Sequence, residues 1–527
     1  MRTIIKILKI GADQNRVGKR FRIAMKRKSD SVANDRWKGK REAEEVNDPE
    51  IQPLSPSFAD LPSPISTNIL RRLPIKSVLI CKCVCKTWHS IVSDPHFAKL
   101  HFKHAPADVM IRTNDPKRVS RTLHLLEFQH ENFRGRSEYD DWDCFCKCDD
   151  FCKPDCNGHM KFEAKFKLPL RDAKMVLDKM LEAKNGGRKR SYIACKPRDD
   201  KFAVVNSCKG LLCLCDPMDR NPLVICNPIT GEFIRLPEAS KILRGTCDCG
   251  FGYHKKTGEF KVIRVYDNYA QDPTNAKKWL FNGRVAEMHT LGTGTWISVG
   301  VGTVPSGLRF PINVNGALHW LRPFSSRSDG LIVRFNFELE RFDKFPCPLD
   351  LVNSHAMNNL DNISMGELSG YLYLCGIVDS DCVNLWLMKK YGVRDSWTKI
   401  YNIEIDGNER WPFGLYRPIK SFNKGAAILM YHSCNCLIYH EHKGYGFNFF
   451  KVRGTQFKFE AFVHIPSLIS LKDAVKGDVE VQNVHSRCAA FKLREENDVL
   501  FLAEENVQLA SLYSSSSDED EEVTSHL

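Results

Sequence analysis

The sequence predicts a multidomain chain in which a short all-α segment of three helices precedes a long all-β propeller, with disordered ends. Apolar residues recur at helical spacing between residues 57 and 102. From residue 105 to about 470, short apolar or alternating runs are separated by turn residues, a pattern typical of many short strands. Residues 1–56 are basic and residues 476–527 end in an acidic run, and neither segment shows that periodicity.

Prolines divide the helical segment. Ser63 is the expected N-cap of the first helix, and Pro64 occupies a position that tolerates a missing N–H. Pro74 interrupts this helix and begins the second. The third helix is expected to end near Asp94-Pro95.

This segment has more large apolar side chains than a unit of about 45 residues is expected to bury. Small units have little interior, so part of their apolar surface stays exposed. One interpretation is an ordinary small helical subdomain. The other is a surface that waits for a partner protein, and the density of apolar residues favours it.

The same residues carry a family resemblance. They include a Leu-Pro opening, an Arg-Leu-Pro-Ile joint at 72–75, a Cys-Val-Cys-Lys-x-Trp segment at 83–88 and a Ser-Asp-Pro exit at 93–95. Together they resemble the F-box of plant F-box proteins, although Ser63-Pro64 replaces the more common acidic pair. The resemblance implies docking on a Skp-family adaptor and, through it, on the cullin and RING subunits of a ubiquitin ligase. The positions that match the adaptor-binding motif are Leu61, Pro62, Ile65, Ile69, Leu73, Pro74, Val78, Leu79, Val84 and Trp88.

The β-rich region is too long for one sandwich or small barrel, whereas a propeller grows by adding blades. Internal repeats are weak. Thr-Gly-Glu-Phe occurs at 230–233 and at 257–260. A second echo, a Trp followed by a β-branched residue, occurs at Trp296-Ile297 and Trp397-Thr398 and suits outer strands of separate blades.

Five ordered segments of this region resemble the F-box-associated domain of plant F-box proteins. They are residues 207–213, 227–237, 250–253, 260–262 and 314–320. The resemblance implies a kelch-like β-propeller that recruits the substrate protein. The expected domain boundaries are therefore 57–102 for the F-box and 105–470 for the propeller.

The net charge of +13 is concentrated at the start of the chain. Residues 1–41 hold 14 Lys and Arg against three acids, so they carry +11 of it. A bipartite import signal is one interpretation of the basic groups, and a solvated arm without a partner is the other; an organellar transit peptide is a weaker option. We expect a location in the nucleus, the cytoplasm or both. The basic residues concerned are Lys26, Arg27, Lys28, Lys38, Lys40 and Arg41.

A cysteine-rich insertion lies between Asp141 and His159. Its thiols and imidazole could hold zinc, but ligands one residue apart rarely converge on one ion, so a flexible surface loop is the other interpretation. The start of the sequence does not resemble a signal peptide, so the 21 cysteines are expected to be in a reducing compartment. The candidate ligands are Cys144, Cys146, Cys148, Cys152, Cys156 and His159.

We find no convincing catalytic constellation, expect no cofactor, and see no run of 18 apolar residues that would span a membrane. A serine run at 514–517 precedes the acids at 518–522 and would suit phosphorylation or simply solubilise the tail.

The resemblance implies a non-catalytic substrate receptor of an SCF-type ubiquitin ligase, with an unknown protein substrate. The rival is a nuclear protein that associates with nucleic acid through the basic leader and zinc, but nucleic acid is not our expected partner. We expect Leu73→Asp or Pro62→Ala to weaken adaptor binding while the propeller stays folded.

Overall fold

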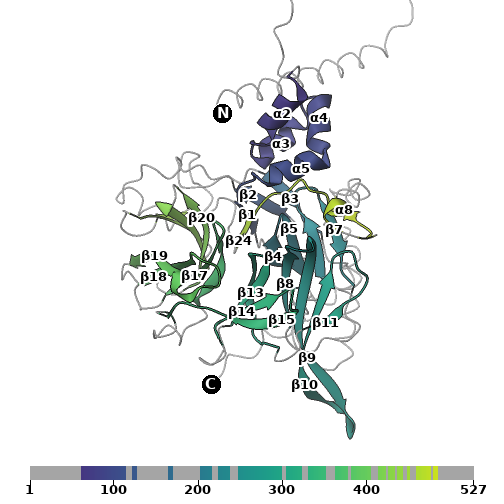
Figure 1. Cartoon of the computed structure of the whole chain (residues 1–527), viewed down its shortest axis with the longest axis vertical. Coiled ribbons are helices and arrows are strands. Elements are labelled where there is room, and N and C mark those ends of the chain that lie inside the picture. Colours follow the sequence, from purple (N-terminus) through teal and green to yellow (C-terminus); the bar gives the residue numbers. More distant parts are fainter. Residues whose placement is uncertain are drawn as a thin grey trace, which may run out of the picture. The chain divides into compact units, whose positions relative to one another are not determined.

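A computed structural model divides the chain into two compact units, Met1–Pro106 and Ala107–Leu527 (Figure 1). The predicted basic leader, cysteine-rich insertion and acidic end lie outside the described residues. The structure describes residues 61–113, 122–126, 164–169, 202–216, 223–237, 247–299, 304–322, 330–349, 351, 362–377, 382–404, 414–422, 425–433, 436–442, 448–450, 459–475, 477 and 479–484.

The first unit contains four described helices rather than the three that the sequence predicts. They are α2 (Ser63–Leu70), α3 (Ile75–Cys81), α4 (Lys86–Ser93) and α5 (Pro95–Phe102). The additional helix follows from Asp94, whose carboxylate accepts the His96 N–H at 2.8 Å while Pro95 begins α5. The N-cap of α2 is Pro62, not Ser63, and no side chain caps this end.

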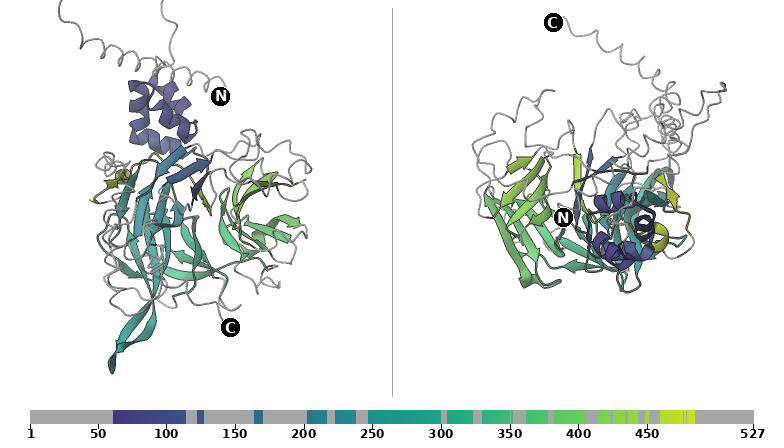
Figure 2. Two further views of the ribbon diagram at one scale, coloured as in Figure 1. Left: turned by 180° about the vertical axis from the view of Figure 1, so that it is seen from behind. Right: turned by 90° about the horizontal axis from the view of Figure 1, so that it is seen from above.

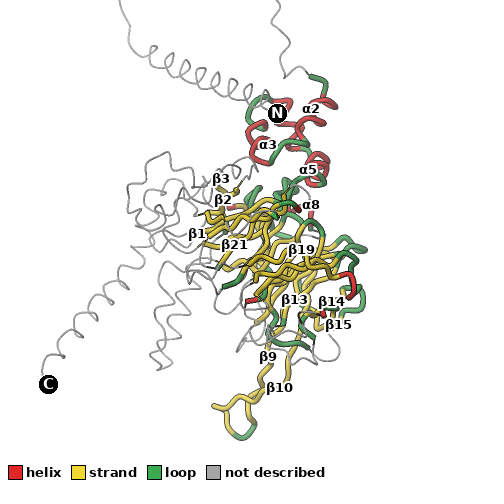
Figure 3. The backbone as a smooth tube through the Cα atoms, turned by 90° about the vertical axis from the view of Figure 1, so that its left-hand side faces the viewer, coloured by secondary structure: helices red, strands yellow, loops and turns green. Residues whose placement is uncertain are grey.

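The second unit consists almost entirely of strands (Figure 3). Twenty-five strands and the short helix α8 (Leu471–Ala474) are described. The strands are β1 (Asp108–Thr113), β2 (Thr122–Leu126), β3 (Ala164–Lys167), β4 (Ala203–Cys208), β5 (Leu211–Cys215), β6 (Leu223–Asn227), β7 (Glu232–Arg235), β8 (Cys247–His254), β9 (Glu259–Asp272), β10 (Asn275–Thr290), β11 (Ile297–Val299), β12 (Arg309–Val314), β13 (Ala317–Leu321), β14 (Ile332–Asn336), β15 (Arg341–Phe345), β16 (Ser364–Leu368), β17 (Tyr371–Ile377), β18 (Cys382–Met388), β19 (Trp397–Glu404), β20 (Tyr416–Phe422), β21 (Ala427–His432), β22 (Cys436–Glu441), β23 (Asn448–Phe450), β24 (Phe459–His464) and β25 (Gln482–Asn483).

These strands form six antiparallel sheets, the blades of a six-bladed propeller (Figure 2). Five blades use consecutive strands: β4–β7, β8–β11, β12–β15, β16–β19 and β20–β23. The sixth combines both parts of the unit, because β24 pairs with β1 from Asp108↔His464 to Thr113↔Phe459. The predicted propeller is confirmed. The sheet domain also continues past residue 470, since β25 adds a fifth strand to the blade of β7.

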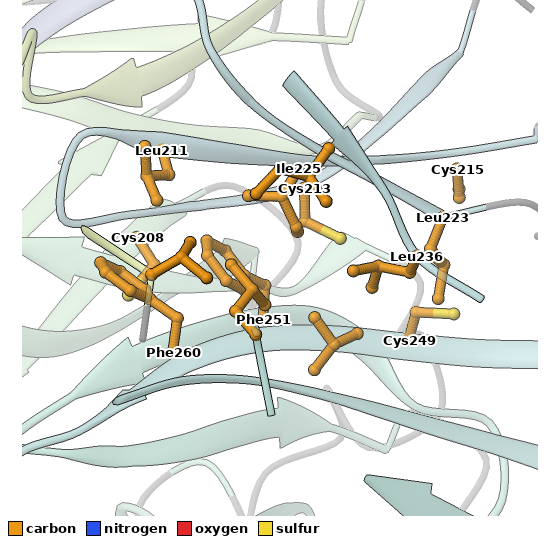
Figure 4. Packing of buried hydrophobic residues seen from close by; sticks show 14 of the residues in the cluster. Cys208, Leu211, Cys213, Cys215, Leu223, Ile225, Leu236, Cys249, Phe251 and Phe260 are labelled. Atoms are coloured by element: carbon orange, nitrogen blue, oxygen red, sulfur yellow. The ribbon is translucent and has the colours of Figure 1, made fainter. Parts of the chain in front are cut away.

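The core lies between neighbouring blades. One cluster joins the blades of β4–β7 and β8–β11, and Cys213, Cys215 and Phe251 are fully buried in it (Figure 4). Burial raises the pKa of the Cys208 thiol in this cluster to about 12. These cysteines therefore pack as small, protonated apolar side chains, as the sequence predicts.

Polar side chains link the backbones of successive blades. The Asn206 amide donates to the Phe251 carbonyl at 2.8 Å and accepts the Phe251 N–H at 3.0 Å. Asn313 accepts the Tyr253 N–H at 3.1 Å. Because each link satisfies buried backbone groups, it fixes the height of one blade against the next.

The two copies of the predicted tryptophan repeat occupy equivalent places in their blades. Trp296 immediately precedes β11 and Trp397 begins β19, the outer strands of their blades. The Trp296 indole donates to the Pro237 carbonyl at 2.9 Å, and the Trp397 indole donates to the Pro346 carbonyl at 3.1 Å. Pro237 follows β7 and Pro346 follows β15, each the fourth strand in sequence of the preceding blade, so the two tryptophans mark a repeated link between blades.

We expect the propeller to lose stability as pH falls from 7.5 to 5. Burial lowers the pKa of His464 to about 3, and burial assisted by Arg334 lowers the pKa of His319 to about 3. Both rings stay neutral in the folded chain but are protonated below about pH 6.5 in the unfolded chain, which then binds more protons. Protonation of each ring in the unfolded chain should lower the unfolding free energy at pH 5 by about 2 kcal/mol.

Urea unfolding at pH 7.5 and pH 5 measures this loss. His464→Gln should reduce the difference between the two values, because the variant lacks one of the rings that titrate on unfolding. An unfolding free energy that is equal at both pH values, or a difference unchanged by His464→Gln, would contradict the assignment.

Candidate functional site

Three of the ten predicted motif positions form the interior of the helical unit. Leu73, Val78 and Trp88 are buried. The Trp88 N–H donates to the Cys85 thiol at 3.4 Å, which caps the start of α4. These residues hold the helices together and are not available on the surface.

The other predicted positions are reachable from solvent. Ile65 on α2 is 49% exposed, and Val84 and Pro62 are also exposed. The half-buried positions are Leu61, Ile69, Pro74 and Leu79. The structure thus separates the motif into an interior and a surface, a division that the sequence did not resolve.

Ile80 is a surface residue that the sequence analysis missed. It is 44% exposed, whereas Ile75 and Val78 on the same helix are buried. Helical spacing contains the signal, since Ile80 lies two positions beyond Val78 and therefore off the face that Ile75 and Val78 share. Ile65, Ile80 and Val84 are named here the exposed apolar set.

A buried histidine fixes the joint between α2 and α3. His101 on α5 donates from Nε2 to the Leu73 carbonyl at 3.0 Å, which satisfies a backbone group where Pro74 breaks the helix. Burial lowers the pKa of His101, so the ring is neutral at neutral pH. Ile65 and Ile80 are therefore carried on helices whose joint is held by a specific contact, and Val84 lies in the turn after the second of them.

This arrangement changes how one predicted variant must be interpreted. Leu73 is only 9% exposed, so Leu73→Asp would place a carboxylate in the interior of the helical unit. Loss of binding in that variant would report unfolding of the helices rather than a missing surface contact. Substitutions at the exposed apolar set avoid this ambiguity.

The surface of the helical unit is basic. Residues 61–106 contain seven Lys and Arg and one acid, Asp94. Exposed members include Arg72, Lys86 and Lys99. A unit that combines exposed apolar side chains with a positive net charge favours a partner that presents apolar pockets within an acidic surface.

In the propeller, the turns that follow several inner strands share one geometry. Lys209-Gly210, Asn315-Gly316 and Ser369-Gly370 all adopt positive φ at both residues, as tight hairpin turns require. Because β4, β12 and β16 begin their blades in the same direction, these turns lie on one face of the propeller. Loops gathered on one face of a rigid scaffold are suited to binding.

Other predicted sites are not observed. The candidate zinc ligands at 144–159 and the basic groups at 26–41 lie outside the described residues. Within the part of the chain that is described, no three His, Cys, Asp or Glu side chains are arranged to hold a metal ion. No described helix is long and apolar enough to cross a membrane.

Comparison with protein families decides the identity. The family described as "F-box associated beta propeller domain" matches residues 172–471, more than half of the chain, and the "F-box domain" family matches residues 58–100. The chain is an F-box protein of the F-box-associated propeller family. The F-box match covers α2, α3, α4 and most of α5, and the propeller match spans most of the six blades.

Relatives of this F-box protein come from Arabidopsis thaliana, so it is a plant-type F-box protein. "F-box protein At3g07870" is 27% identical, and the alignment covers 65% of this chain and 72% of the relative. "F-box protein CPR1" is 24% identical over 69% of this chain and 77% of the relative. "F-box/kelch-repeat protein At3g23880" is 24% identical over 65% and 79%.

Solved structures resemble the F-box protein only distantly. A chain described as "YCF48 bound to D1 peptide" aligns with a TM-score of 0.26 and 8% identity, covering 47% of this chain and 81% of that chain. A likeness of this size carries no argument about function.

Proposed function

We propose that this F-box protein is the substrate-recognition subunit of an SCF-type ubiquitin ligase. Its F-box docks on a Skp-family adaptor, and through it on cullin and RING subunits, while the propeller recruits a protein substrate. The observation that carries the proposal is the exposed apolar set, Ile65, Ile80 and Val84, on an F-box whose own interior is already filled. Apolar side chains left at the surface of a packed unit favour a protein partner.

The basic surface of the F-box supports the same proposal. Its positive charge is expected to accelerate association with an acidic adaptor and to make the rate fall with added salt. The apolar contacts are expected to set how long the complex persists.

The proposed receptor performs no chemistry itself. The F-box and propeller are adaptor-type domains, and binding at both would hold a substrate lysine close to the activated ubiquitin carrier. Proximity alone supplies a large part of the rate in such a complex, because two reactants become parts of one assembly.

Co-purification of the full chain with a recombinant Skp-family adaptor and the cullin amino-terminal domain tests this proposal. The wild-type chain should elute from size exclusion as a ternary complex. A chain lacking residues 58–102 should keep the β-sheet circular dichroism of the propeller but elute without either partner. Failure of the wild-type chain to bind the adaptor would reject the receptor function.

A further inference from the structure

One hairpin of the propeller extends beyond its blade. Strands β9 and β10 have 14 and 16 residues, whereas β8 in the same sheet has 8. The neighbour β8 pairs with β9 only as far as Tyr266, and β11 pairs with β10 only from Ala286. The two strands continue as an extension, Asp267–Val285, which is named here the arm and projects from the end of the sheet (Figures 1 and 3).

The base of the arm is held by charged side chains. Arg284 donates from Nε to Asp267 at 2.8 Å and from Nη1 to the Pro305 carbonyl at 3.2 Å. Just inside the blade, Glu287 accepts from Tyr266 at 2.9 Å. The arm is therefore joined to a rigid part of the propeller.

A bulge separates this base from the rest of the arm. Between the pairs Phe281↔Tyr269 and Arg284↔Asp267, two residues of β10 oppose one residue of β9. The second of the two, Gly283, has φ +81, and a β-carbon there would have no atom within 4 Å. Bulges bend a ribbon and redirect its side chains, so the side chains of the outer arm point in a different direction from those at its base.

That face is aromatic. Phe281 lies directly opposite Tyr269, and Trp279 lies two residues before Phe281, so all three share one side of the ribbon. The Tyr269 and Phe281 rings meet edge to face with centroids 5.8 Å apart. Phe281 is nonetheless 61% exposed and Trp279 is exposed as well. Aromatic side chains contribute much of the binding energy at protein interfaces, so exposed ones indicate a binding surface.

The arm also has free strand edges. No described strand pairs with the outer side of β9 beyond Tyr266 or of β10 before Ala286. A two-stranded ribbon alone is marginally stable and offers rows of N–H and C=O groups that a third strand would satisfy. An extended peptide that pairs at such an edge gains backbone hydrogen bonds and places alternate side chains on the aromatic face.

The charge of the arm selects among such peptides. Residues 267–284 contain Lys277, Lys278 and Arg284 against two aspartates. Arg284 binds Asp267, and Asp272 accepts two hydrogen bonds from Thr274, at 2.9 Å from its N–H and 2.6 Å from its hydroxyl. The Lys278 ammonium group lies 3.8 Å from the Asp272 carboxylate, but the Lys278 side chain is 63% exposed, so this loose pair leaves the ammonium group open to a second carboxylate. A peptide with a carboxylate beside its apolar residues would complement it.

We propose that the arm is a strand-pairing site for an extended, acidic and apolar segment of a partner protein. The segment adds as a third strand to the arm, its alternate apolar side chains cover Tyr269, Trp279 and Phe281, and its carboxylate meets Lys278. The binding itself is independent of the F-box. Only the identification of the bound protein as a ubiquitination substrate rests on the proposed function.

Membrane insertion fits the arm less well. A hairpin that enters a bilayer places apolar residues at its tip, but the tip here is the polar sequence Asp272-Pro273-Thr274-Asn275. Insertion would bury the Asp272 carboxylate, which is costly. Pairing of two arms from two copies is the other alternative, but the only acids that a second arm offers to Lys278 are Asp267 and Asp272, which Arg284 and Thr274 already engage.

The test uses a phage-displayed library of random 12-residue peptides, selected on the immobilised full-length protein. Enriched peptides should alternate apolar residues with polar ones and contain Asp or Glu. Trp279→Ser/Phe281→Ser should weaken the best synthetic peptide at least 10-fold in fluorescence anisotropy. Methylation of alternate peptide nitrogens should weaken it 10-fold in one register and little in the other, because only one row of N–H groups faces the arm.

Leu339→Ser is the matched control, since Leu339 is 56% exposed in the turn of another blade, and peptide affinity should not change. The proposal is overturned if no peptide is enriched, or if peptides bind the arm variant as well as wild type. It is also overturned if the arm variant instead loses dimerisation in light scattering or flotation with phosphatidylserine vesicles. Adaptor binding, measured on the same samples, should be equal in all variants; its absence in wild type would reject the receptor function and leave the arm untouched.

Discussion

Replacing both Ile65 and Ile80 by aspartate is expected to weaken adaptor binding at least about 100-fold, or about 2.7 kcal/mol. The two isoleucines are 49% and 44% exposed and lie outside the buried interior, so the free F-box loses few contacts when they change. In the proposed complex, however, each carboxylate would be removed from water without a partner, which costs several kcal/mol. Isothermal titration calorimetry of the full chain with the purified adaptor measures the change.

Asn68→Asp is the control for this experiment. Asn68 is exposed on α2, so the substitution adds one carboxylate to the helix that carries Ile65 without removing apolar surface. It should change the affinity less than about 5-fold, since exposed charge pairs contribute little. If Ile65→Asp/Ile80→Asp binds as tightly as Asn68→Asp, the exposed apolar set is not the docking surface.

Gly250→Ala is expected to lower the unfolding free energy of the propeller by about 3 kcal/mol. A β-carbon at Gly250 would lie 2.5 Å from Leu318 and 2.5 Å from Trp320, both buried side chains of the next blade. Trp320 cannot move freely, because its indole donates to the Cys249 carbonyl at 3.4 Å. The added methyl group therefore has to push two blades apart, and urea unfolding of the purified variant measures the cost.

Gly294→Ala provides the comparison. A β-carbon there would have no atom within 4 Å, so the same chemical change should alter the unfolding free energy by less than about 0.5 kcal/mol. Equal effects at the two positions would mean that the close approach of β8 and β13 is not what requires glycine at 250.

The sequence predicted the elements whose signals are local. Pro74 marked the joint between α2 and α3, and the turn glycines and alternating runs marked a propeller. It did not predict α5, because the spacing after Asp94 was interpreted as an exit rather than as a new N-cap. Gly250-Phe251-Gly252-Tyr253 was recognised as part of a family pattern, but the reason for its glycines lies in side chains about 70 residues away.

Properties that depend on contacts between distant residues could not be predicted from the sequence. The blade that joins β24 to β1 needs a pairing across about 350 residues, which leaves no local trace. The separation of Leu73 from Ile80 into interior and surface depends on how four helices pack. The sequence analysis also missed the arm. Its residues alternate as in an ordinary strand, and the arm differs only in having no described neighbouring strand on either side.

The blade shared by β1 and β24 has a consequence for synthesis on the ribosome. The four F-box helices are complete once residue 102 has emerged and can fold early, but β1 must wait for β24, which is among the last strands translated. At the usual rate of about 5–20 residues per second, the nascent propeller carries an open edge at β1 for roughly 20–70 seconds. During that interval chaperones, rather than the finished ring, must protect β1, and a message truncated before codon 459 would yield a permanently open ring.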